Sequence, residues 1–543
     1  MENNKPTAEA RYAELERRRH FYLSQAERSA LLTIPSIFPE NADQKDRSNP
    51  NDLPQPWQSF GAYATESLAS KFLLTSFPPT QSFFRFEISE KEISDAIAAG
   101  AEGQEVENLR LEIQKALASR ERAINKEFEA GTYRVQLQEV FRQLLVAGNC
   151  LVYMPPEGGG LQVYNLGQYV VSRDPLGKLT ELVVRECFHW TTLPEAVQKL
   201  AQNKPSNDLS SSSDDEIVDV YTHLKLDGKY HHTHQEAFSQ VVPGSESKFK
   251  IAKSPWLPLR FSQITGEHYG RGFIENYRGT LNSLDVLRRS IVENSAAAAR
   301  TVFMVRPNGT TKVRTLQSTP NGGYVSGSAD DVSVLRMDKQ GDMSIAQATA
   351  DGLIRELSFA FLLNSAIRRD AERVTAEEIR EMARELEGAS GGAYSVLSQE
   401  LQLPIVSRLQ ALLERRGDIP AIPGDSVKPV VVTGLQAIGR SQELITVREL
   451  LSDLAAAASL NPQIVQFIDA HDLASKILMG HGVPEDGLLK TKQEVQAEME
   501  AQQAAQTQAN LIDSGMQAIP GVVENAANQM MNEGGAPDGS EIQ

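Results

Sequence analysis

Cysteine, basic residues and long apolar runs are scarce in this sequence, and each shortage excludes something. The 543 residues include two cysteines, Cys150 and Cys187, and neither belongs to a CxxC pair. Two such cysteines cannot form a disulfide framework, so we expect the chain to fold in a reducing cytoplasm. No stretch approaches 18 uninterrupted apolar residues and the first residues lack an apolar signal core. We therefore expect neither secretion by that route nor a membrane span.

Basic residues are outnumbered: 54 Lys and Arg stand against 71 Asp and Glu, which gives a net charge of -17. A protein that binds nucleic acid tightly neutralises phosphates and normally has a basic excess. Composition alone therefore disfavours tight DNA binding. Ten of the acidic residues but only two lysines follow residue 484, so a net charge of -8 lies in a Gln- and Ala-rich tail.

The first half of the chain changes from helical to β-type patterning. The spacing of apolar residues predicts four helices, over 7–32, 57–77, 89–127 and 133–147. Short β-type runs follow between 150 and 265, and the Asp227–Gly228 pair suits a tight hairpin. The predicted fold class is α+β, with a mostly helical region that leads into an antiparallel sheet.

Two long helices are predicted after the sheet, from 272 to 300 and from 345 to 364. The residues between them, 301–344, form a compact insert with three β-type pieces, TVFMVRP, GGYVSG and VSVLRMD. A further strand, KPVVVTG, is predicted within 425–434, and helices return from about 440 to 480.

A short polar segment after the second long helix carries three arginines, Arg368, Arg369 and Arg373. On a single subunit, a solvated surface loop is the simpler interpretation. In a ring, symmetry would bring one such loop per subunit towards a common axis.

The helix that follows opens with a capping box at Thr375 to Glu378. Its periodic pattern contains Gly388, Gly391 and Gly392. Glycine costs about 1 kcal/mol relative to alanine inside a helix, so the three glycines predict a kink or a flexible joint.

Enzyme signatures are scarce. We find no GxxxxGK[ST] phosphate loop, no GxGxxG after a strand, no HExxH and no GxSxG, and we predict no cofactor. The nearest approach to a metal cluster is a group of histidines on two facing strands: His223, His231, His232 and His234. Solvent-facing histidines on an edge strand are the simpler interpretation, because no carboxylate or cysteine completes the set at a convincing spacing. The acidic run at 214–216 is similarly interpreted as a solvated loop.

Nine strings of residues resemble the portal, or head-to-tail connector, proteins of short-tailed podoviruses of the Autographivirus type. They occur in family order between residues 33 and 440: TIPSIFP (33–39), PWQSFGAYATESLASKFLLTSFPP (56–79), LLVAGNCLVYMP (144–155), YVVSRDPLG (169–177), DVYTHLKLD (219–227), GEHYGRGFIENYRGTLNSL (266–284), LSFAFLLNSAIRRDAERVTAEEIR (357–380), GGAYSVLSQELQLP (391–404) and TGLQAIGR (433–440). The match weakens at 200–215, at 235–255 and beyond 480.

The resemblance implies a dodecameric ring at one capsid vertex, through which double-stranded DNA is packaged and later ejected, and not an enzyme. The implied regions are a wing (1–265), a first stem helix (266–300), a clip (301–344), a second stem helix (345–364), a tunnel loop (365–375), a kinked wing helix with a return strand (376–440), and a crown with the acidic tail (441–543).

The resemblance also implies partners. These are eleven further copies of the chain, the large terminase that is the packaging ATPase, tail adaptor and tube proteins, major capsid and scaffolding proteins, internal core proteins, and transient non-specific DNA, with no membrane. The protein would be made in the host bacterial cytoplasm and reside in the virion. Four clip residues would dock the ATPase and later the tail: Arg306, Lys312, Arg314 and Arg336. The three loop arginines would touch DNA weakly on an otherwise acidic wall, so that it can slide.

Two interpretations from other classes stay open at this point. One is a metal-dependent enzyme built around the histidine strands, and the other is an internal virion or scaffolding protein. Closed rings, elongated assemblies or stoichiometric zinc would distinguish the three.

Overall fold

The computed structural model describes most of the first four fifths of the chain. The described residues are 6–38, 53–79, 82–88, 103–202, 217–298, 302–335, 340–363, 384–386, 388, 392–420, 427–431 and 452. Contacts divide the chain into two units, Met1–Gly439 and Arg440–Gln543, and the first contains all the described residues except Ser452. Among the described helices, none is long and apolar enough to cross a membrane.

The helices predicted for the first part of the chain are confirmed. They are α1 (Ala8–Leu31), α2 (Phe60–Ser76), α4 (Gly103–Ala130) and α5 (Tyr133–Ala147), and the predicted start of α4 at 89–102 lies outside the described residues. Thr7 caps α1, since its side chain accepts a hydrogen bond from the Ala10 amide. Gly148 ends α5 with a φ of 72° and turns the chain directly into the first strand of the sheet region.

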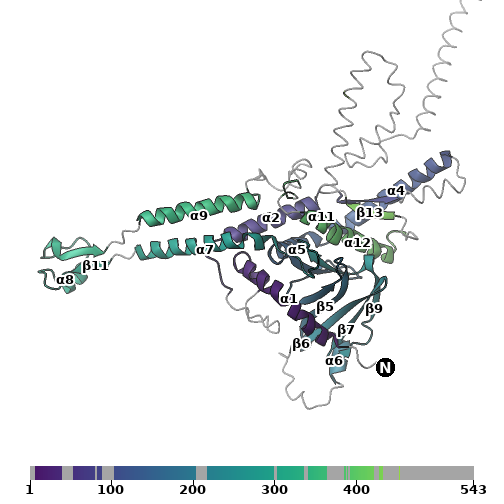
Figure 1. Cartoon of the computed structure of the whole chain (residues 1–543), viewed down its shortest axis with the longest axis horizontal. Helices are drawn as coiled ribbons and strands as arrows, with labels where there is room; N and C mark the ends of the chain where they lie inside the picture. Colours follow the sequence, from purple (N-terminus) through teal and green to yellow (C-terminus); the bar gives the residue numbers. More distant parts are fainter. Residues whose placement is uncertain are drawn as a thin grey trace, which may run out of the picture. The chain divides into compact units, whose positions relative to one another are not determined.

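The predicted antiparallel sheet region is confirmed as two sheets (Figure 1). A three-stranded sheet has the order β10-β2-β3, from Trp256–Arg260, Asn149–Tyr153 and Gln162–Tyr164. A six-stranded sheet contains β4 (Tyr169–Arg173), β5 (Leu179–His189), β6 (Ile217–Asp227), β7 (Tyr230–Ala237), β8 (Gln240–Val241) and β9 (Ser247–Lys250). The predicted hairpin joins β6 to β7, and Gly228 supplies its positive φ of 59°.

Two elements of this region were not predicted. Helix α6 (Glu195–Gln202) lies between β5 and β6, and β1 (Phe84–Ile88) pairs antiparallel with β13 (Val427–Val431). The strand at β13 is the one predicted from KPVVVTG, but its partner lies far away in the sequence.

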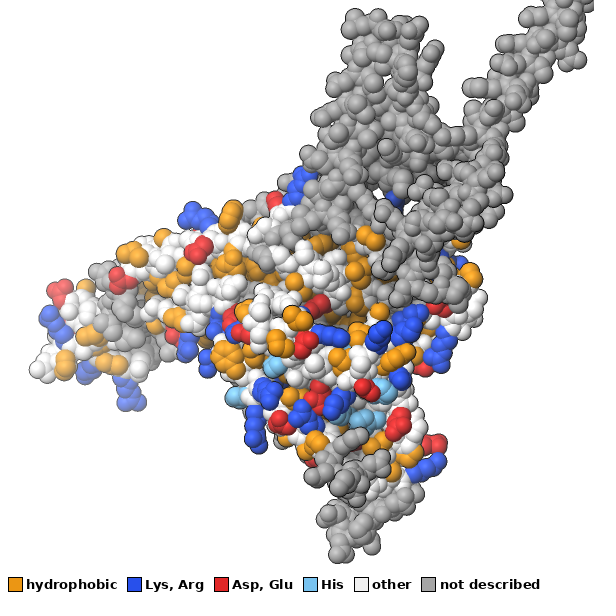
Figure 2. All heavy atoms as spheres, turned by 45° about the vertical axis from the view of Figure 1, so that its right-hand side comes forward, with side chains coloured by type: hydrophobic (Ala, Val, Ile, Leu, Met, Phe, Trp, Pro, Cys, Tyr) orange, Lys and Arg blue, Asp and Glu red, His pale blue; other side chains and the backbone are white. Residues whose placement is uncertain are grey.

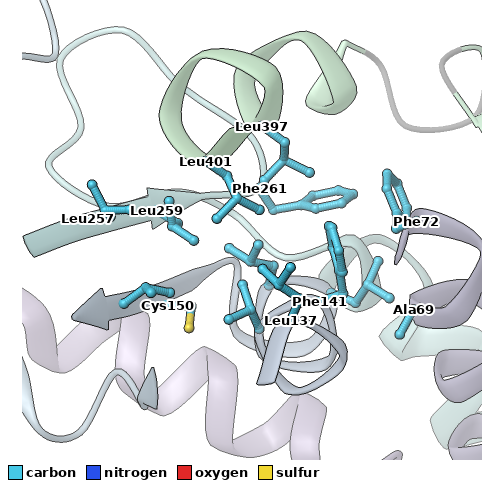
Figure 3. Close-up of a cluster of buried hydrophobic side chains, with 14 of the residues drawn as sticks. Ala69, Phe72, Leu137, Phe141, Cys150, Leu257, Leu259, Phe261, Leu397 and Leu401 are labelled. Atoms are coloured by element: carbon cyan, nitrogen blue, oxygen red, sulfur yellow. The ribbon is translucent and has the colours of Figure 1, made fainter. Parts of the chain in front are cut away.

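The main core joins helices from both ends of the described chain to the three-stranded sheet (Figure 3). The ring of Phe72 on α2 lies 5.9 Å from that of Phe141 on α5 and 5.7 Å from that of Phe261, which follows β10. Leu397 on α11 (Ala393–Leu397) and Leu401 close this cluster from the other side. Helices α2 and α5 and the segment after residue 392 therefore form one hydrophobic core with the sheet.

After α11 the helical path changes its pitch. Residues Ser398–Gln402 form a π-helical segment, which continues into α12 (Leu403–Arg416). Short π segments interrupt the hydrogen-bond ladder of a helix and often bend it.

Candidate functional site: the α7–α9 helix pair and its insert

Two long helices lie side by side and carry an insert at their far end (Figure 1). They are α7 (Phe273–Ala298) and α9 (Gln340–Ala360), and they agree with the predicted long helices, although α9 begins at Gln340 instead of near 345. The first turn of α9 is polar, so apolar spacing alone could not mark its start.

The helix pair is anchored to the core at one end only. All four buried residues of α7 lie in its first half: Phe273, Ile274, Leu281 and Leu284. Just after α9, the ring of Phe361 meets that of Phe273 edge to face, with centroids 5.2 Å apart. Beyond Leu284, α7 has no buried side chain within its described residues.

Large apolar side chains are exposed along the pair. Val286 and Val292 on α7 are 54% and 48% exposed, and Ile345 and Phe359 on α9 are 67% and 78% exposed. Figure 2 shows hydrophobic side chains on the surface of this part of the molecule. Two helices can bury one face each against the other, so further apolar positions need another partner.

The insert is a small folded unit of its own. Strand β11 (Val302–Val305) pairs with β12 (Val332–Leu335), and α8 (Val313–Ser318) lies between them. The strands predicted at TVFMVRP and VSVLRMD are thus confirmed. The strand predicted at GGYVSG is wrong, because residues 322–327 have no strand and β11 already pairs with β12.

One carboxylate holds the insert together. Asp331 accepts hydrogen bonds from the Thr310 hydroxyl at 2.9 Å, the Thr311 amide at 3.1 Å and the Thr311 hydroxyl at 3.2 Å. The bond from Thr310 is the largest of the effects that lower the pKa of Asp331. Sequence reasoning missed this residue, because Thr310 and Thr311 lie 21 and 20 residues before Asp331 and no local pattern links them.

The predicted docking residues of the insert are exposed where they are described. Arg306 follows β11, Lys312 directly precedes α8 and Arg314 lies in its first turn, whereas Arg336 lies outside the described residues. The insert also exposes aromatic and sulfur-containing side chains, with Phe303 at 63%, Met304 at 53% and Tyr324 fully exposed.

The three arginines of the predicted loop fall outside the described part of the chain, and two of the three joint glycines fall within it. Arg368, Arg369, Arg373 and Gly391 lie outside the described residues. Gly388 is helical, and Gly392 has a φ of 88° directly before α11. The role of these glycines as a joint stays a prediction.

In the part of the chain that the structure describes, histidines of these strands pair with carboxylates and form no metal cluster. His223 and His234 are cross-strand partners, and their Nε2 atoms lie 2.9 Å from Oε1 of Glu181 and Glu236 respectively. The acidic run at 214–216 lies outside the described residues.

The same two carboxylates fasten α1 to the sheet. Glu181 accepts hydrogen bonds from the Arg11 guanidinium, and Glu236 accepts one from the Ala8 amide at the start of α1. Burial raises the pKa of Glu181, but the hydrogen bonds from His223 and Arg11 outweigh it and lower the pKa to about 2. We therefore assign the histidine strands a structural role in the described fold.

With the helix pair, insert and core in place, comparison with known proteins decides the family. The sequence model of the family described as "Bacteriophage head to tail connecting protein" matches residues 5–489. The chain belongs to this family. The predicted resemblance to podovirus portal proteins is thereby confirmed.

Curated relatives of this connector chain share most of its length. The portal protein of Escherichia phage T7 is 37% identical over 506 residues, which is 92% of this chain and 91% of the relative. That of Enterobacteria phage T3 is 38% identical over 508 residues, again 92% and 91%. That of Enterobacteria phage SP6 is 30% identical over 525 residues, 95% and 96%.

Solved structures are more distant. A chain from the neck of a native gene transfer agent particle, computed with C12 symmetry, has 12% sequence identity and a TM-score of 0.35 and covers 77% of this connector chain and 89% of its own. The metal-enzyme and scaffolding interpretations gain no support from any of these relatives.

Proposed function

We infer that this chain is a phage portal protein, a component of the virion that forms the channel for DNA at one vertex of the capsid. The observation that carries the inference is identity of 37% and 38% to two portal proteins over 92% of the chain. The family model, which matches residues 5–489, includes the core, the helix pair and the insert together.

We propose that twelve copies form a ring in which α7 and α9 are the stem helices. The exposed apolar residues of the pair support this, since neighbouring copies would cover them. Twelve helices about 9 to 10 Å apart have a circumference of roughly 115 Å and a radius of about 18 Å to the helix axes. Subtracting about 5 Å for helix half-thickness leaves a bore of roughly 26 Å, which admits a DNA duplex.

The charge of the stem fits a channel that passes DNA without holding it. Helix α7 carries three acidic and three basic residues, and α9 carries three acidic residues and one arginine, so the pair has a net charge of -2 per subunit. We propose that the few phosphate contacts come from Arg368, Arg369 and Arg373 on the tunnel loop, 365–375. Weak, mobile contacts create shallow energy wells along the path of the DNA.

The remaining regions follow the same assignment. We propose that residues 1–265 and 376–440 form the wing, that 301–344 form the clip, and that 441–543 form the crown and its acidic tail. The insert supports the clip assignment because it is a folded unit at the tip of the helix pair. Its exposed Arg306, Lys312 and Arg314, with Arg336, would dock the packaging ATPase and later the tail adaptor.

The chain would also meet major capsid, scaffolding and internal core proteins, and ATP hydrolysis would belong to the terminase. Imaging of the purified protein in negative stain tests the ring. Closed rings with a central hole are expected, and filaments or monomers at micromolar concentration would contradict it.

The channel loop has a separate test. Replacing Arg368, Arg369 and Arg373 by alanine should leave rings intact but reduce the amount of DNA that procapsids package and retain. Normal packaging and retention by this variant would remove the proposed role of the loop.

A further inference from the structure

The end of the six-stranded sheet near the β6–β7 turn carries lysines in register. Lys225 on β6 lies opposite His232 on β7, which lies opposite Lys248 on β9. One row further towards the turn, Asp227, Tyr230 and Lys250 are opposite each other in the same way. Side chains that are cross-strand partners, or two residues apart on one strand, share one face of a sheet.

These side chains are exposed on that face. Lys225, Lys248 and Lys250 are all exposed, and no ion pair holds any of them within the described residues. The Lys248 ammonium lies 4.2 Å from the centre of the Tyr230 ring. The acidic groups nearby are Asp227, whose carboxylate is 3.8 Å from His232, the exposed Glu246 ahead of β9, and the buried Glu181, which lies opposite Lys225 on β5 and is paired with Arg11 and His223.

We define the lysine patch as Lys225, Lys248 and Lys250 with Lys229 in the adjacent turn. These four residues are basic, although the chain as a whole is strongly acidic. Neighbouring strands are about 4.8 Å apart, so three strands span about 10 Å from Lys225 to Lys248. DNA carries one phosphate per about 3.4 Å of axis on each strand, so a patch of this width matches about three phosphates.

We propose that the lysine patch is a second DNA-binding surface, outside the channel, that contacts the phosphates of duplex DNA without sequence preference. This proposal rests on the proposed portal function in one respect, which is that DNA is present in the same particle.

The residue types favour phosphate over an acidic protein as the occupant. Protein interfaces are depleted in lysine and enriched in arginine, and this patch has four lysines and no arginine. Lysine is a compact, hydrated point charge on a flexible stem, which suits phosphate contacts that need no fixed geometry. The edge strand β9 pairs only with β7 among the described strands, and its lysines also discourage pairing with another protein strand.

A covalently closed circular duplex separates the patch from the channel, since closed DNA cannot thread through a closed ring. Binding of a fluorescent circle to the full-length assembled protein is measured between 50 and 200 mM salt. The test variant is K225Q/K248Q/K250Q, and the control is R122Q/K126Q/K199Q, which removes the same charge from exposed basic residues on α4 and α6.

The expected result is that the test variant binds the circle at least tenfold more weakly at 50 mM salt. Its slope of log affinity against log salt should also fall by about 2 to 3, at roughly 0.9 per lost phosphate contact. The control should lose less than threefold. Equal losses in both variants, or none in either, would overturn the proposal.

An acidic peptide of polyglutamate provides the competing occupant. Loss of peptide binding with unchanged DNA binding in the test variant would overturn the proposal in favour of a protein partner. Ring formation is scored in the same samples by mass photometry. Failure to form rings while the patch-dependent DNA binding persists would contradict the portal assignment alone.

Discussion

Gly148 shows how a single residue is dictated by its surroundings. It ends α5 with a φ of 72°, and a Cβ there would lie 2.3 Å from the carbonyl carbon of Arg271 and 2.4 Å from the amide nitrogen of Gly272. The backbone between the sheet and α7 passes so close that only a hydrogen fits. The contact links the end of α5 to the start of the helix pair.

Replacing Gly148 by alanine should therefore destabilise the protein by about 3 kcal/mol or more, from a left-handed backbone and a steric overlap together. Gly228 is the matched control, because its φ is also positive at 59° and its Cβ would meet nothing within 4 Å. Gly228→Ala should cost about 1 kcal/mol. Urea unfolding measures both, and similar losses would mean that the close approach is unimportant.

His231 is a second residue whose environment decides its chemistry. It is 3% exposed, and neither ring nitrogen has a hydrogen-bond partner in the described structure. Burial, with a smaller effect of Lys178, lowers the pKa of His231 to about 4. The folded state therefore binds fewer protons than the unfolded state between pH 6.5 and 4.

The contribution of His231 to stability is thus complete above pH 6.5 and is lost as the pH falls towards 4. At pH 5 the loss is at most about 2 kcal/mol. Between pH 7 and pH 5, the melting temperature of His231→Phe should fall less than that of the parent. His20→Gln, at an exposed site, should behave as the parent. Equal pH profiles for parent and His231→Phe would contradict the assignment.

At the scale of elements, α1 is held by polar contacts as well as by its apolar face. Tyr12 and Leu15 pack against Val170 and Val183 of the sheet, and Glu181 joins the helix through Arg11. The carboxylate of Glu181 is only 10% exposed, so removal of its charge weakens the hydrogen bonds that it accepts from His223 and from Arg11, although Arg11 keeps the exposed Glu14.

Glu181→Gln should release α1, at a cost of about 1 to 3 kcal/mol. The amide protons of α1 should exchange faster with deuterium, while those of α5 should not change. Since the pKa of Glu181 is lowered to about 2, its contribution is present above about pH 4.3 and is lost as the pH falls to 2. Glu14→Gln, which removes an exposed partner of the same arginine, is the control; an equal effect on exchange would exclude a specific role of Glu181.

Elements were predictable where their signal is local. Helical spacing predicted α1, α2, α5 and α7, and the Asp-Gly turn predicted the β6–β7 hairpin. Pairing between distant segments has no such signal, so β1 and its register with β13 were missed. The strand predicted at 322–327 was wrong for a related reason. Its residues suit a strand, but in the folded insert β11 pairs with β12 instead. The histidine strands show the same limit at a site, because the carboxylates they bind come from β5 and from β7 itself.

At the scale of the whole molecule, the net charge and the exposed apolar surface bear on two separate properties, adhesion to DNA and contact between copies. The chain has a net charge of -17, and the helix pair is acidic, yet the sheet region carries a lysine patch and the helix pair exposes apolar residues. In the proposed ring, an acidic channel wall would reduce adhesion of DNA, whereas apolar contacts between copies would be insensitive to the charge of what passes through.

Exposed apolar residues on the helix pair should therefore control assembly without controlling folding. Ile345→Asp combined with Phe359→Asp places two carboxylates where a neighbouring copy would bury the parent side chains, at 67% and 78% exposure in the isolated chain. Burying an unpaired carboxylate is costly, so rings should be lost or weakened at least tenfold in concentration, while the melting temperature of the monomer changes by no more than a few degrees. Mass photometry over a concentration series measures assembly.

Leu176→Asp, at an apolar residue that is 89% exposed on the β4–β5 turn, is the control and should leave rings intact. If the double variant assembled as well as the parent, these surfaces would face solvent or the channel, and the subunit contact would have to lie on the opposite faces of α7 and α9.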